Sequence, residues 1–340
     1  MQGTDGNFYG TTFQGGYKEN GTIFRISPSG KFLSLFNLHG TNGSNPEAPL
    51  IQGSDGAFYG TTDNGGANNA GVVFKFVNGS LTVLHSFTGG SDGIGPIGGL
   101  VEATDGNFYG TTFAGTCGDG TIFRITPAGE FATLYTLPSD GSMGCEPDST
   151  LLQHTNGLLY GTTDAGGMVN RGVFFSFDVG LGPFVTFLPA ARQVGHTVEI
   201  LGQGLTGTIG VSFNGTPATT FSVLTDTFMT ATVPGGATSG SIKVTTPGGT
   251  LISNKQFEVK PQVTSFSPTS GPVGTSVTLT GMSLSQTSKI TFNSAVATNF
   301  TVNSDSQVTV TVPAGATTAK IGITTTGAPV YSPSQFTVTQ

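Results

Sequence analysis

Short apolar runs separated by glycine-rich turns make up the first half of the chain. In "GTIFRI", "GVVFKF" and "GVFFSF" the apolar residues are adjacent, as at Ile23-Phe24 and Val73-Phe74, so they point to both faces of a strand. A strand that is apolar on both faces is covered on both sides, in contrast to a strand with one wet face. The pattern therefore predicts short strands in sheets that are packed between neighbouring sheets.

A Tyr-Gly-Thr-Thr box occurs four times in this half, with tyrosines spaced 50, 50 and 51 residues apart. Each unit contains an apolar run, an Asp-Gly or Asn-Gly turn, the box, a glycine-rich loop, a "GTIFRI"-like run, a second turn and a last apolar run. We name these four predicted strands A to D. Asp-Gly and Asn-Gly favour two-residue type I′ hairpins. Four strands with a period near 50 are typical of a propeller blade.

Repetition of the box indicates architecture, since a catalytic motif usually occurs once. We expect each tyrosine ring to fill the space between blades and its hydroxyl to reach a backbone partner. Each box glycine then lets a neighbouring chain approach closely. The alternative is a ring of four tyrosines that stack on sugar, which the absence of tryptophan weakens. The expected structural anchors are Tyr9, Tyr59, Tyr109, Tyr160, Gly10, Gly60, Gly110 and Gly161.

The string "DGNFYGTT…GG…GTIFRITPAGEF…LYTL" resembles the bacterial GloVer, or Gloeo-Verruco, tandem repeat. The resemblance covers residues 1–182, in units near 1–49, 50–99, 100–150 and 151–182. It implies a β-propeller on a secreted or surface-anchored protein, and it brings no enzymatic residues with it.

The array is expected to be incomplete as a ring, because the first unit opens at the end of a strand A and the fourth stops at strand C. We interpret this as N-terminal truncation, which also explains why "MQGTDGNFYG" has no signal-peptide character. A short array that is open, or that is closed by oligomerisation, is the alternative.

The second half contains a different repeat, with a period of 79 residues over 183–260 and 261–340. "TVPGGATSG" in the first copy matches "TVPAGATTA" in the second, and alternating runs such as "SVTLTG" lie between turns. Such alternation predicts immunoglobulin-like sandwiches. "FSPTSGPVGTSVTLTGMSL" resembles the start of an IPT/TIG domain. The first copy has Ala190-Ala191-Arg192 where "PTSGP" is expected, yet its spacing carries the same fold.

Charge and composition exclude several function classes. The 340 residues include 54 glycines and 26 phenylalanines, and only 9% are charged. Residues 1–182 hold 15 acids and 6 bases, whereas 183–340 hold 4 acids and 6 bases. The absence of a Lys/Arg cluster argues against nucleic acid and anionic membrane surfaces as partners. No apolar stretch approaches the roughly 20 residues that span a bilayer.

The two cysteines, Cys117 and Cys145, both lie in the third repeat. Strand order places Cys117 in the B–C loop and Cys145 in the D–A connection, which emerge on the same face. We therefore predict a structural disulfide, in keeping with an exported protein. Two unpaired thiols or a redox site are the alternatives, although the spacing lacks the CxxC form.

Other polar residues give no chemical motif, and no catalytic, metal or cofactor-binding residue is assigned. The histidines lie apart and have no partner at metal-ligand spacing; they are His39, His85, His154 and His196. Asp63 and Asp164 follow the box in two repeats, but no pair stands out as the two acids of a glycosidase. The acidic residues of the loops do not follow the ligand spacing of an EF-hand-like Ca²⁺ site. The glycine-rich run at Gly89 opens no helix and is read as a D–A connection.

Together these features predict a non-catalytic binding or display module, extracellular or at the cell surface. The propeller serves as the interaction platform and the TIG pair as a spacer, and the partner is an unknown protein or carbohydrate. The alternative is a polysaccharide-acting enzyme with its site on the propeller face, which a unique acid cluster on that face would favour.

Overall fold

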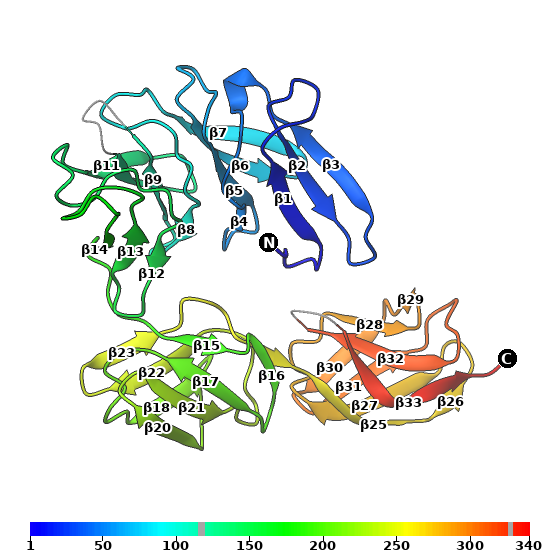
Figure 1. Ribbon diagram of the computed structural model, residues 1–340. Coiled ribbons are helices and arrows are strands. Elements are labelled where there is room, and N and C mark those ends of the chain that lie inside the picture. The colour runs from blue at the N-terminus through cyan, green and yellow to red at the C-terminus, as the bar shows by residue number, and fades with distance from the viewer. Residues whose placement is uncertain (115–119, 326–328) are drawn as a thin grey trace. The chain divides into compact units, whose positions relative to one another are not determined.

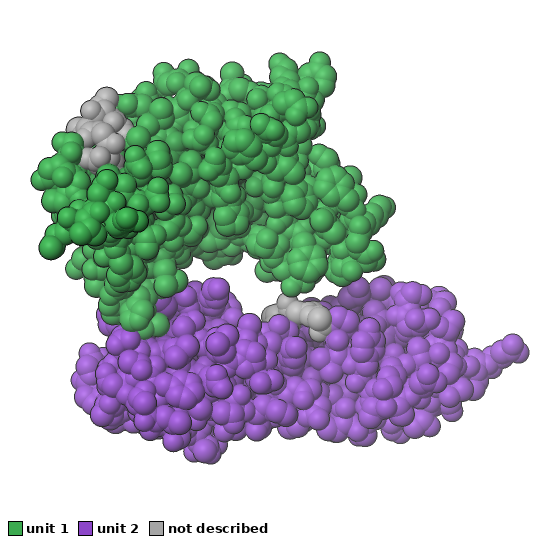
Figure 2. Space-filling view, viewed as in Figure 1, with its two compact units in different colours: residues 1–181 green, residues 182–340 purple. Residues whose placement is uncertain are grey.

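The computed structural model describes residues 1–114, 120–325 and 329–340, and it is all-β (Figure 1). In the described part of the chain the single helical element is the 3-10 turn η1 (Gly40–Asn42). The chain divides into two compact units, Met1–Leu181 and Gly182–Gln340 (Figure 2). Each unit is built from small antiparallel sheets of three to five strands, with short parallel pairings in the second.

Four sheets follow one another in the first unit, one for each sequence repeat (Figure 1). Sheets 2 and 3 have four strands in the orders β4-β5-β6-β7 and β11-β10-β9-β8, and sheets 1 and 4 have three. Sheet 1 comprises β1 (Phe8–Thr12), β2 (Thr22–Ile26) and β3 (Phe32–Asn37); sheet 2 comprises β4 (Ile51–Gln52), β5 (Phe58–Thr62), β6 (Val72–Val77) and β7 (Ser80–Ser86); sheet 3 comprises β8 (Val101–Glu102), β9 (Phe108–Thr112), β10 (Thr121–Ile125) and β11 (Phe131–Thr136); sheet 4 comprises β12 (Leu152–Gln153), β13 (Leu159–Thr162) and β14 (Phe174–Phe177).

An apolar cluster fills each gap between consecutive sheets. Tyr9 and Ile23 of sheet 1 pack with Phe74 of sheet 2, and Tyr59 of sheet 2 packs with Phe108 of sheet 3. The third cluster joins sheets 3 and 4. Inner strands thus bury both faces, as the adjacent apolar pairs in their sequences predict. The sheets are arranged like successive propeller blades.

The box glycine sits opposite a phenylalanine in every repeat. Gly110 pairs with Phe123 across β9 and β10, and a Cβ added at Gly110 would lie 2.6 Å from the Phe123 ring. The equivalent added atoms at Gly60 and Gly161 would also lie 2.6 Å from a ring. The glycine therefore makes room for a phenylalanine ring of the next strand, and this ring lies over the glycine backbone.

The Asp-Gly turns before the box differ from the expected type I′ geometry. Gly6 has φ of 81° while Asp5 keeps a negative φ, and the Gly6 N–H donates to the Gly3 carbonyl at 2.9 Å. A type I′ turn needs positive φ at both central residues, so this is a three-residue loop with glycine in the left-handed position. The type I′ expectation was wrong here. A type I′ turn does occur between β6 and β7, where Asn78 and Gly79 have φ of 50° and 82°.

The second unit contains two sandwiches with matching strand order. One sheet reads β15-β17-β21-β20 in the first and β25-β27-β31-β30 in the second. The strands of the first are β15 (Thr186–Leu188), β16 (Ala191–Gln193), β17 (Thr197–Leu201), β18 (Gly210–Phe213), β19 (Thr216–Pro217), β20 (Phe221–Thr225), β21 (Phe228–Thr232), β22 (Ile242–Thr246), β23 (Gly249–Ile252) and β24 (Glu258–Lys260). Those of the second are β25 (Gln262–Ser267), β26 (Ser270–Gly271), β27 (Ser276–Met282), β28 (Lys289–Phe292), β29 (Ala295–Val296), β30 (Phe300–Ser304), β31 (Gln307–Thr311), β32 (Ala319–Thr324) and β33 (Val330–Val338).

Each sandwich closes its own apolar core from alternating residues. Phe213 packs edge-on against Phe257 with ring centroids 5.2 Å apart, and Phe292 packs against Phe336 at 5.4 Å. All four rings are at most 1% exposed. The strand starts of the two sandwiches keep the offset found in the sequence: β18 begins at Gly210 and β28 at Lys289.

Substitution of the box glycine tests the packing of the repeats. We expect Gly110→Ala to lower the free energy of unfolding of the repeat unit by about 1 to 3 kcal/mol, because the new methyl overlaps a buried ring. Urea unfolding followed by circular dichroism measures the loss. Gly40→Ala is the matched control, since an added Cβ there meets nothing within 4 Å. Equal midpoints for both variants would contradict the close approach of Phe123.

Independence of the second unit is a separate prediction. The fragment 183–340 is expected to fold alone, because both sandwich cores are made from its own residues. It should give a β-type circular dichroism spectrum and a cooperative melt at the temperature seen for this unit in the full chain. A fragment without a cooperative transition would show that the sandwiches need the repeat unit.

Candidate functional site

The hydroxyl of the box tyrosine holds the preceding turn. Tyr9, Tyr59 and Tyr109 each donate to the aspartate four residues earlier, with O–O distances of 2.8, 2.8 and 2.9 Å. In the fourth repeat the Asn156 side chain donates to the Tyr160 hydroxyl at 2.9 Å. The partner is therefore a turn side chain, where we expected a backbone group. Burial, followed by the hydrogen bond to Asp105, raises the pKa of Tyr109.

The ring of the same tyrosine crosses to the next sheet. Tyr9 stacks against Phe58 with centroids 4.2 Å apart, and Tyr59 against Phe108 at 4.0 Å. The three inner tyrosines are 0 to 9% exposed, which leaves no free ring face for a sugar. At the third gap the equivalent of these phenylalanines is Leu159, so the Tyr109 ring meets a smaller side chain there.

The two threonines of the box close the ends of the repeat. The first donates to a carbonyl in the following connection, as Thr61 does to Gly98 at 3.2 Å. The second accepts the first backbone N–H of strand C in all four repeats, at 2.9 to 3.2 Å. These bonds hold the connection to the next sheet and the loop that follows the box, so all four box residues have structural roles.

A glutamine or glutamate of each following sheet reaches back to the turn before it. Gln52 accepts the Thr4 N–H at 2.9 Å, and Gln153 accepts the Thr104 N–H at 3.0 Å. Glu102 accepts both the N–H and the hydroxyl of Ser54. The repeats are therefore linked by polar bridges at their rim in addition to the apolar contacts in each gap.

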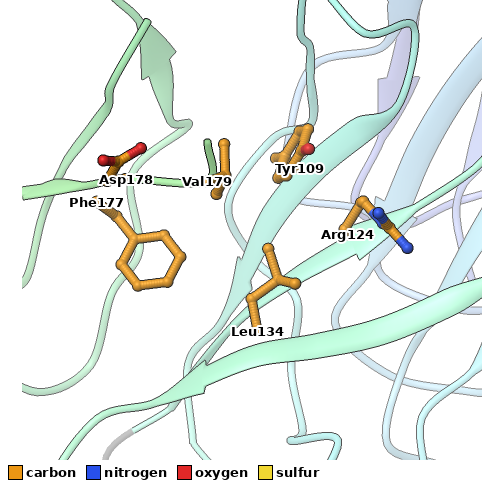
Figure 3. A pocket seen from close by; sticks show the side chains of 6 residues that line it. All are labelled: Tyr109, Arg124, Leu134, Phe177, Asp178 and Val179. Carbon is orange, nitrogen blue, oxygen red and sulfur yellow. The ribbon is translucent and has the colours of Figure 1, made fainter. Parts of the chain in front are cut away.

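A pocket of about 300 Å³ opens in the gap between sheets 3 and 4. It is lined by Tyr109, Arg124, Leu134, Phe177, Asp178 and Val179. Figure 3 shows the charged ends of Arg124 and Asp178 on opposite sides, with apolar side chains between them. Its size lies at the lower end of the range for small-molecule sites. Because it holds one cation and one anion, its chemistry suits a neutral polar ligand.

Arg124 has an environment that differs from its equivalent in sheet 2. There Lys75 is paired with Asp55 at 2.8 Å and lies over the Tyr59 ring. In the third repeat the Arg124 Nε is buried, and the described residues offer it no hydrogen-bond partner. A buried guanidinium N–H without a partner is costly, whereas the cation of the second repeat is paired with Asp55.

The pocket exists because sheet 4 lacks a fourth strand among the described residues. In the preceding gap, Phe131 of β11 fills this space and packs against His85, Phe87 and Phe123. Sheet 4 ends at β14, and the chain leaves it through Asp178 and Val179. Asp178 stands where the other repeats carry Ser27, Val77 and Thr126, so it is a charge found in one repeat alone.

Two acids lie close together elsewhere in the repeat unit. Burial raises the pKa of Glu47, and the nearby Asp63 charge raises it further; burial also raises the pKa of Asp63. Asp164, which is the counterpart of Asp63 in the fourth repeat, is exposed. Within the described ranges no three His, Cys, Asp or Glu side chains are grouped closely enough to hold a metal ion.

The histidines lie in separate surroundings. His85 stacks on Phe131 at 3.7 Å and contacts Asp92 at 3.0 Å, and burial lowers its pKa although Asp92 opposes that shift. His39, His154 and His196 are exposed. Cys145 lies in the D–A connection, where its backbone pairs with Ala165, while Cys117 lies outside the described residues. The disulfide stays a prediction.

No described helix is long and apolar enough to cross a bilayer. The model of the Gloeobacter/Verrucomicrobia repeat matches residues 1–175, and that of the IPT/TIG domain matches residues 261–338. No curated protein matches the sequence. The second match agrees with the sandwich built by β25 to β33.

Solved structures show limited likeness. The surface glycan-binding protein PbSGBP-B from Prevotella bryantii is 19% identical with a TM-score of 0.31, over 47% of this chain and 40% of that one. SGBP-B from Bacteroides uniformis is 20% identical with a TM-score of 0.23, over 45% and 48%. A putative 6-phosphogluconolactonase from Bacteroides fragilis is 13% identical with a TM-score of 0.33, over 97% and 95%. The chain spans less than half the length of either glycan-binding protein, and these scores assign no ligand.

The turn contact of the tyrosine predicts an asymmetry between two substitutions of one residue. Asp105→Ala should cost about 1 to 3 kcal/mol of stability, because it leaves the buried Tyr109 hydroxyl without its partner. Asp105→Asn should cost less than about 1 kcal/mol, because Asn156 makes the same contacts in the fourth repeat. Urea midpoints compare the two variants. Equal losses would show that the carboxylate charge matters and the hydrogen bond does not.

Proposed function

The chain belongs to the Gloeobacter/Verrucomicrobia repeat family, and from this premise we propose that it is a non-catalytic binding module at the cell surface or outside the cell. In this proposal the repeat unit carries the ligand site and the two sandwiches act as a spacer. The site is the pocket between sheets 3 and 4, and its ligand is a neutral saccharide.

The chemistry of the pocket supports a saccharide ligand. Arg124 supplies N–H donors, the exposed Asp178 supplies an acceptor, and Phe177 supplies aromatic surface. A sugar ring presents hydroxyls that both donate and accept at its edge and apolar C–H groups on its faces. The combination of apolar side chains with a few placed polar groups is typical of small-ligand sites. The placement of Arg124 and Asp178 on opposite sides of a pocket, with apolar side chains between them, is the observation that carries the proposal.

The spacer role is supported by the self-contained cores of the two sandwiches. Because each closes its own core, the pair can hold the repeat unit away from an attachment point without contributing to the ligand site. The surface location is supported by the low charged fraction and the glycine- and threonine-rich composition. The predicted Cys117–Cys145 disulfide, once demonstrated, would add to that support.

Titration calorimetry of the full chain with a xyloglucan oligosaccharide and a mixed-linkage heptasaccharide tests the ligand. We expect binding to at least one probe, and Arg124→Gln and Asp178→Asn should each weaken it by roughly tenfold, since each removes one polar contact. The matched control is Arg25→Gln, at the equivalent position of the first repeat. It should leave the affinity unchanged.

Two results would overturn the proposal. Equal loss of binding in Arg25→Gln and Arg124→Gln would place the site elsewhere. Release of shorter saccharides during incubation with the chain would show catalysis. A melt of each variant that matches the wild type confirms that lost affinity reflects lost contacts.

A further inference from the structure

Both end sheets of the repeat unit expose side chains that are buried in the inner repeats. On sheet 1, Phe8 is 45% exposed, whereas its equivalent Phe108 is fully buried. On sheet 4, Phe174 is 70% exposed, whereas its equivalents Ile23, Val73 and Ile122 are at most 2% exposed. Phe32 and Leu152 are exposed by 57% and 63% on the same two sheets.

The exposed residues belong to opposite sides of the repeat. Phe8 is the equivalent of Phe58 and Phe108, and each of those two rings stacks on the box tyrosine of the preceding sheet. Tyr160 and Phe174 are the equivalents of Tyr9 and Ile23, which contact the following sheet. We call the first side, with Phe8 and Phe32, the leading face, and the second, with Tyr160, Phe174 and Leu152, the trailing face. The two faces are the two halves of one repeat-to-repeat contact.

The inner gaps show what covers such faces. In each of them a leading face of one repeat packs on a trailing face of its neighbour, with ring centroids about 4 Å apart where both rings are present. Gln2 and Gln52 make the same contact with the turn of their own repeat. The Gln2 Nε2 donates to the Gly6 carbonyl, and the Gln52 Nε2 donates to the Gly56 carbonyl, both at 3.0 Å. Gln52 uses its oxygen to accept the Thr4 N–H of the preceding repeat.

We propose that the leading face of one copy of this chain docks on the trailing face of a second copy, so that the array of repeats continues across the two molecules. Phe8 then stacks on Tyr160 of the other copy, and Gln2 bridges to the turn of its fourth repeat. The contact is heterologous, because each copy contributes a different face. Repetition of such a contact gives a closed ring or an open filament.

Paired lysine variants test the contact by light scattering after gel filtration of the full chain. The wild type is expected to gain mass as its concentration rises, and added salt should promote this, because the repeat unit carries a net negative charge that salt screens. F8K/F32K, which blocks the leading face, and L152K/F174K, which blocks the trailing face, should each be monomeric. A mixture of the two variants should form a dimer that does not grow further. The intact trailing face of F8K/F32K can dock on the intact leading face of L152K/F174K, and no other pair of intact faces remains.

The control is I209K/L224K, which adds the same charge at exposed apolar residues of the second unit and should associate like the wild type. All substituted residues are exposed, so melts that match the wild type are expected. A wild-type chain that stays monomeric at all concentrations overturns the proposal. So does association of either blocked variant alone, which would indicate like-to-like contact, and so does a mixture that stays monomeric.

Discussion

The repeat unit depends on the box tyrosine, because this one side chain connects three parts of the structure. Its backbone pairs strands B and C, its hydroxyl binds the turn that precedes it, and its ring packs on the next sheet. An aromatic pair contributes about 0.5 to 1.5 kcal/mol beyond the area that it buries. Each contact alone is modest, but repeat arrays are stabilised by the sum of their nearest-neighbour interfaces.

This arrangement explains the composition. A strand covered on both faces carries apolar side chains on both, so the abundant phenylalanine of the repeat unit follows from sheets that are stacked on sheets. Glycine opposite the phenylalanine ring is a consequence of the same close spacing, as Gly110 and Phe123 show. The sandwiches do not need this glycine–phenylalanine pairing, since each of their main sheets has one inner face and one outer face in water.

Strand pattern and repeat spacing predict most of the fold. The four boxes mark the sheets, and the 79-residue offset marks the sandwiches, because both signals are periodic and local. The turn before the box was missed because Asp-Gly suits both two- and three-residue hairpins. The deciding contact is Asp5 with Tyr9, and its sequence signal was the constant four-residue separation of Asp or Asn from the tyrosine. The pocket was missed because Arg124 fits the repeat pattern, and only tertiary packing shows the space that the described residues leave beside it.

Under the proposed function, departures from the repeat are therefore more informative about binding than the repeat itself. Positions that recur in every unit, such as the tyrosine and its turn partner, are used for packing in every unit. Leu159 and Asp178 break the pattern in the last repeat, and they lie at the gap where sheet 4, within the described residues, lacks a strand. A smaller side chain and a missing strand leave space, and Asp178 adds a polar group at its edge. An array of near-identical contacts thus acquires a pocket between sheets 3 and 4, without loss of the contacts that hold the other sheets together.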